Sequence, residues 1–63
     1  MEKAMLVLNL YVEGVYGQSE AIRKLDELGF KTPEDIHDLK TEAEGYFPSV
    51  QFNRIKRYIL ECM

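Results

Sequence analysis

Cys62 is the only cysteine in a chain of 63 residues, and this limits how the fold can be stabilised. No disulfide can form within the chain, although domains this small often depend on disulfides, a bound metal or association with another chain. Only His37 offers a second soft metal ligand, and two such ligands do not complete a tetrahedral zinc site. We therefore expect one small domain over residues 1–63, with no metal or other cofactor.

The first sixteen residues are too uniformly apolar for periodicity to identify their structure. Leu6 and Leu8 begin an alternating pattern that suits a strand, whereas Met5, Leu8 and Val12 would lie along one side of a helix. A lone strand would leave its backbone donors and acceptors unpaired, because nothing later in the chain reads as a second strand. We favour a helix, and the alternative is a strand over residues 4–16 that pairs with another chain.

The middle of the chain carries signals that begin and end helices. Ser19 is a candidate N-cap for a helix that stops at Gly29, where glycine can adopt the left-handed conformation that closes a helix. Thr32 and Pro33 predict the start of the next helix, since threonine caps and a proline at the first position loses no hydrogen bond. That helix is expected to end near Gly45. The positions expected to face inward are Ala21, Ile22, Leu25, Leu28, Ile36, Leu39 and Ala43.

A last helix is predicted to begin with Ser49 as its N-cap. Its apolar residues, which recur at helical spacing, are Phe52, Ile55, Ile59 and Cys62. This pattern makes Cys62 a small hydrophobic residue at the end of the buried stripe. The predicted fold class is therefore all-α, a compact bundle of about four short helices.

Neither reactive side chain is placed for catalysis. His37 lies between two nearby aspartates, but Ile36 and Leu39 define the inward face of its helix and leave the imidazole toward solvent. Cys62 has no fixed basic group beside it that would stabilise a thiolate. We therefore expect no enzymatic activity. A lone cysteine is typical of a reducing compartment, which favours a cytoplasmic location, and the longest apolar run is too short for a membrane span.

Charge is distributed unevenly along the chain. Residues 18–45 contain eight acids and four bases, a net charge of −4, whereas residues 46–63 contain three bases and one acid, a net charge of +2. Arginine and tyrosine are enriched at the energetically dominant positions of protein–protein interfaces. The residues predicted to bind a partner protein are Arg54, Arg57, Tyr58 and Tyr46.

The apolar N-terminal segment exceeds what so small a core can cover, which suggests a subunit interface. The residues predicted at a homodimer contact are Leu6, Leu10 and Tyr11. We expect a small cytoplasmic regulatory, adaptor or inhibitor-type protein that binds another protein stoichiometrically, a type that phages and mobile elements encode. The alternative is a helical nucleic-acid-binding regulator that uses the basic C-terminal helix, although a net charge of −3 opposes binding to a polyanion.

Overall fold

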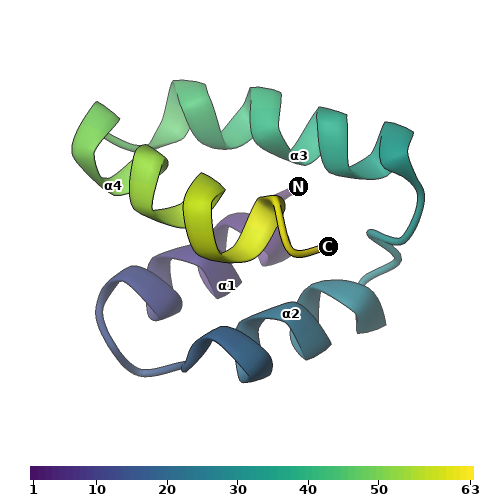
Figure 1. The fold of residues 1–63 in the computed structure, drawn as a ribbon, viewed down its shortest axis with the longest axis horizontal. Coiled ribbons are helices and arrows are strands. Elements are labelled where there is room, and N and C mark those ends of the chain that lie inside the picture. Colours follow the sequence, from purple (N-terminus) through teal and green to yellow (C-terminus); the bar gives the residue numbers. More distant parts are fainter.

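The N-terminal segment, for which the sequence leaves helix and strand open, forms a helix in the computed structural model, which describes residues 1–63 (Figure 1). No strand is present, so the prediction of an all-α bundle is confirmed and the strand alternative is wrong. The elements are α1 (Glu2–Val12), α2 (Gln18–Glu27), α3 (Pro33–Tyr46), α4 (Ser49–Ile55) and a π-helical turn, η1 (Lys56–Leu60). None of the helices combines the length and the apolar character needed to cross a bilayer.

The α4–η1 segment occupies the centre of the bundle. In Figure 1, α3 and α2 run along opposite sides of the molecule, α1 lies behind, and α4 with η1 passes in front between them. The segment packs against all three of the other helices. The largest fully buried side chains come from every helix: Leu8, Leu25, Leu39, Ile55, Ile59 and Leu60. Because no buried residue is polar or charged, hydrophobic packing holds the helices together.

Local signals define the connection from α2 to α3 as predicted. Gly29 has a φ of +97°, its N–H donates to the carbonyl of Asp26, and the N–H of Phe30 donates to the carbonyl of Leu25. These two bonds form a Schellman motif, which satisfies carbonyls that the end of a helix would leave unpaired. Phe30 then folds back onto the core, where it is partly buried.

Thr32 closes the start of α3 with a capping box. The Asp35 N–H donates to the Thr32 hydroxyl at 3.2 Å, and the Thr32 N–H donates to the Asp35 carboxylate at 3.2 Å. Pro33 occupies the first helical turn, where its missing N–H leaves no hydrogen bond unmade. The hydrogen bond from the Thr32 backbone to the carboxylate lowers the pKa of Asp35, with smaller contributions from the Thr32 side chain and the Lys31 backbone.

The two serines predicted as N-caps do not cap. α2 begins one residue before Ser19, with Gly17 at the N-cap position, and α4 begins at Ser49 itself, with Pro48 at the N-cap position. Neither helix has a side-chain capping bond. Pro48 has a φ of −58° and an extended ψ, and its carbonyl accepts the first helical bond, from the Phe52 N–H.

The C-terminal stripe departs from its predicted register in η1. The N–H of Glu61 donates to the carbonyl of Lys56 at 3.0 Å, five residues back. A π turn holds one more residue than an α turn, so the residues after it are displaced around the helix axis. Within this segment Ile59 and Leu60 are both buried, whereas Cys62 after it is exposed. The prediction that Cys62 ends the buried stripe is therefore wrong.

Candidate functional site

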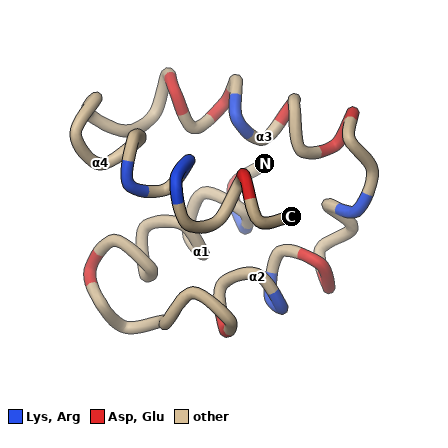
Figure 2. Tube along the Cα trace, viewed as in Figure 1, with Lys and Arg blue, Asp and Glu red and all other residues tan.

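The α4–η1 segment gathers three of the four residues predicted to bind a partner. Arg54, Arg57 and Tyr58 are exposed, and with Asn53 they line a shallow hollow of about 360 Å³. Figure 2 shows basic positions along this segment and mostly acidic positions along α3. We call these four residues the arginine strip. Lys56 is also exposed but does not line the hollow, so only two cations share this surface.

Each guanidinium of the arginine strip is held over an aromatic ring rather than by a carboxylate. The Cζ of Arg54 lies 5.6 Å from the ring centre of Tyr11, and that of Arg57 lies 5.4 Å from the ring centre of Tyr58. The only two ion pairs in the structure both belong to Arg23, on α2. The N–H donors of Arg54 and Arg57 therefore remain open to an external acceptor.

Arg23 on α2 differs from the arginines of the arginine strip because it forms ion pairs within its own helix. The Arg23 guanidinium donates to Glu20 at 2.6 Å and to Glu27 at 2.9 Å. The hydrogen bond from Arg23 lowers the pKa of Glu20, and the same bond raises the pKa of Arg23. The charge of Arg23 is thus already neutralised within its own helix, whereas the charge of the arginine strip is not.

Tyr46 lies on a different surface from the other predicted partner-binding residues. It is 63% exposed, at the end of α3, with its ring in edge contact with Phe47. It lines a second hollow, of about 410 Å³, between α1 and α3. We call this hollow the α1–α3 groove, and its lining residues are Met1, Glu2, Met5, Leu6, Glu42 and Tyr46.

The three residues predicted at a dimer contact occupy three different environments. Leu6 is 57% exposed and lines the α1–α3 groove, and Leu10 is half-buried. Tyr11 is only 7% exposed and belongs to the core, beneath the guanidinium of Arg54. Tyr11 therefore contributes to internal packing and presents little surface in the single chain, and its place at a dimer contact stays a prediction.

The two reactive side chains lie apart from both surfaces. His37 is exposed on α3, and its imidazole makes no hydrogen bond, while its carbonyl accepts one from the Thr41 hydroxyl. The Sγ of Cys62 accepts a hydrogen bond from the Gln18 side chain at 3.2 Å. Gln18 also donates to the carbonyl of Tyr58, which links the start of α2 to η1. No group of three or more His, Cys, Asp or Glu side chains is arranged to hold a metal ion.

Two exposed surfaces of different character therefore stand out. The arginine strip carries two cations and no acid, whereas the α1–α3 groove carries two carboxylates and no lysine or arginine. Sequence reasoning missed that Leu6 and Tyr46 share a surface, because they are forty residues apart and meet only where α1 packs against α3. In comparisons with protein-family models, curated proteins and solved structures, no match to this chain was found.

Proposed function

We propose that this protein acts by binding another protein stoichiometrically, as a small regulator, adaptor or inhibitor, through the arginine strip. The observation that carries the proposal is the pair of unpaired guanidiniums of Arg54 and Arg57 beside the exposed ring of Tyr58. Arginine and tyrosine are the residue types that supply most of the binding energy at such interfaces. A partner that offers carboxylates to this strip would meet donors with no internal acceptor. The free Cys62 suits a reducing cytoplasm as the place of action.

Stacking on aromatic rings favours binding by this strip. Each guanidinium is already restrained over a ring, so less side-chain entropy is lost when a partner carboxylate is bound. The strip also lies on the segment that packs against every other helix, so the backbone beneath it is supported from three sides. A rigid, cationic and partly aromatic surface of this kind fits an acidic patch on a folded protein.

The test is affinity capture from the native host with four baits: the parent, the Arg54→Ala, Arg57→Ala double variant, Tyr58→Ala, and Lys56→Ala as the control. Lys56→Ala removes a cation that is also exposed but does not line the hollow. We expect a protein that the parent and Lys56→Ala retain, with or without nuclease, and that the double variant and Tyr58→Ala lose. Circular dichroism checks that each variant is folded. Equal retention by all four baits contradicts the proposal.

Nucleic acid is the alternative ligand of the same cations. Two phosphate contacts would give a slope of log K against log salt of about −2, which is shallow for a committed DNA-binding protein. The net charge of −3 adds repulsion from the rest of the surface. We therefore expect negligible binding of the parent to DNA or RNA at physiological salt. Submicromolar binding that the double variant abolishes would favour the nucleic-acid regulator instead.

A further inference from the structure

The α1–α3 groove combines flexible apolar side chains with a large share of exposed surface. Leu6 and Tyr46 are more than half exposed, and Met1 is half exposed, although each is large and apolar. Met1 and Met5 add two unbranched thioether side chains to the lining. Methionine adapts its shape to an incoming side chain, and methionine-rich surfaces are common where a protein receives an apolar anchor. The lining is therefore suited to accept a bulky hydrophobic residue.

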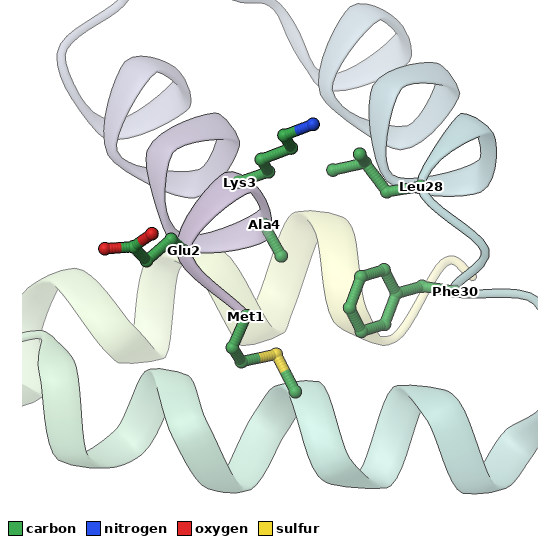
Figure 3. Close-up of a pocket in the computed structure, with 6 residues that line it drawn as sticks. All are labelled: Met1, Glu2, Lys3, Ala4, Leu28 and Phe30. Carbon is green, nitrogen blue, oxygen red and sulfur yellow. The ribbon is translucent and has the colours of Figure 1, made fainter.

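The apolar surface continues past Met1 into a neighbouring hollow. This neighbouring hollow, of about 400 Å³, lies between the start of α1 and the end of α2. It shares Met1 and Glu2 with the α1–α3 groove. Figure 3 shows Leu28 and Phe30 on its far side, with the Lys3 side chain reaching toward Leu28. The two adjoining hollows together present apolar side chains from the start of α1, the end of α2 and α3.

Charge distinguishes the two sides of Met1. Figure 3 shows the Glu2 carboxylate directed away from Leu28 and Phe30, whereas Lys3 lies on their side. In the groove itself the charged side chains are Glu2 and Glu42, beside the Met1 ammonium, and none of the three groups forms an ion pair. An apolar floor with two unpaired carboxylates at its edges is complementary to an apolar anchor flanked by cations.

The same two carboxylates disfavour a symmetric homodimer through this groove. In a two-fold contact each surface meets its own copy, so Glu2 and Glu42 of one chain would face Glu2 and Glu42 of the other. No lysine or arginine lines the groove, so the Met1 ammonium is the one cation there to offset two carboxylates. Like charges brought together across an interface oppose its formation. The homodimer that the sequence predicts through Leu6 is therefore a poorer occupant than a basic partner.

We propose that the α1–α3 groove is a second docking site, which receives a basic amphipathic helix of a partner protein. The helix inserts an apolar side chain between Leu6 and Tyr46, and its lysines or arginines pair with Glu2 and Glu42. Recognition of this kind places one face of a helix in a hydrophobic groove and uses flanking charges to set its orientation. The site is independent of the arginine strip, because no residue lines both surfaces.

The test uses a fluorescein-labelled synthetic helix of about fourteen residues, with leucine and phenylalanine four positions apart and lysines on both sides. The control peptide replaces every lysine with glutamate. Fluorescence anisotropy with the parent protein is expected to show saturable one-to-one binding of the lysine peptide. Binding of the glutamate peptide should be at least about tenfold weaker. Equal affinity for the two peptides, or no saturable binding of the lysine peptide, overturns the proposal.

Variants of exposed residues locate the binding without unfolding the protein. Leu6→Ser and Glu42→Lys should each weaken binding of the lysine peptide by about tenfold. Val15→Ser is the matched control for Leu6, because Val15 is 63% exposed and lines no hollow. Glu44→Lys is the matched control for Glu42, because it is exposed on α3 outside the groove. Loss of affinity in the controls equal to that in Leu6→Ser and Glu42→Lys contradicts the assignment.

Two further measurements separate this site from the other possibilities. The Arg54→Ala, Arg57→Ala double variant should bind the lysine peptide as the parent does. A negative result for partner binding at the arginine strip therefore does not contradict binding in the α1–α3 groove. Sedimentation of the parent should show a monomer at micromolar concentration. A dimer that Leu6→Ser dissociates and Val15→Ser does not would assign the groove to a second copy of the chain and overturn the proposal.

Discussion

Between Gly29 and Asp35 the chain turns from α2 into α3 through local hydrogen bonds, whereas the α4–η1 segment begins without any side-chain cap and ends in a π turn. The first region contains a positive-φ glycine, a capping box and a proline in the first helical turn. The second contains three large side chains, Ile55, Ile59 and Leu60, that are all buried among the other helices. The first region is therefore defined by its own residues, and the second is defined by the helices that surround it.

The difference shows which kind of structural information is local. A capping hydroxyl or a left-handed glycine acts within four residues, so it can be recognised in the sequence alone. A π turn replaces regular α-helical hydrogen bonds and changes the direction of the following side chains. It is favourable only when the surrounding core buries those side chains in their new positions. In this protein Ile59 and Leu60, within the π turn, are both buried.

The largest effect is expected from Leu60→Ala. Leu60 is 2% exposed, and truncating a buried leucine costs about 2–5 kcal/mol. A chain of this size has a net stability of roughly 3–5 kcal/mol, so the variant should lose most of its cooperative thermal unfolding by circular dichroism. Cys62→Ala, at an exposed position, should change stability by less than about 0.5 kcal/mol. A greater loss in Cys62→Ala than in Leu60→Ala would show that the α-helical register continues and that no π turn forms.

An intermediate effect is expected from Gly29→Ala. A Cβ at Gly29 would meet no atom within 4 Å, so the cost comes only from the φ of +97° and should be about 1–2 kcal/mol. Gly45→Ala is the matched control, because its Cβ would also meet nothing and its φ is not positive. Inside α3 that change should stabilise the protein by about 0.5–1 kcal/mol. Urea unfolding measures the change in stability of each variant. Equal effects of the same sign would contradict the explanation that the cost at Gly29 comes from its positive φ.

A smaller loss is expected from Thr32→Ala, which removes the capping oxygen and should cost about 1 kcal/mol. Ser49→Ala is the control, since that serine makes no capping bond and its loss should change stability by less than about 0.5 kcal/mol. Thermal unfolding of the two variants side by side tests the comparison directly. If Ser49→Ala proved as costly as Thr32→Ala, the C-terminal segment would also depend on a local cap.

The smallest effect is a pH dependence at the same capping box. Because the folded protein lowers the pKa of Asp35, its carboxylate contributes stability above the pKa that it has in the unfolded chain. That contribution should be lost as the pH falls below about 4 and through the lower pKa of the folded state. Asp35→Asn cannot titrate, so its midpoint of thermal unfolding should fall less than that of the parent between pH 6 and pH 3. Parallel curves would show that Asp35 is not stabilised by Thr32.

For the candidate sites, the sequence predicted the composition of the surfaces better than their grouping. Arg54, Arg57 and Tyr58 were predicted to act together, and they do share one hollow because they lie within five residues on one segment. Tyr46 was assigned to the same set but lies with Leu6 instead. No pattern within either helix indicates that these two residues share a hollow, since this depends on how α1 and α3 pack.

The sequence by itself determined that the chain is helical from α2 onward, where α2 ends and where α3 begins, because these outcomes depend on interactions within a few residues of the backbone. It also determined the separation of acidic and basic segments, since charge is a property of composition. Tertiary structure decided that Tyr11 is buried beneath Arg54, that Leu60 replaces Cys62 in the core, and that α1 and α3 form a groove. The physical reason is that the burial of a side chain depends on the surfaces of the neighbouring helices. In an almost wholly apolar segment several faces are equally suited to burial, so the packing of the other helices decides which face is buried.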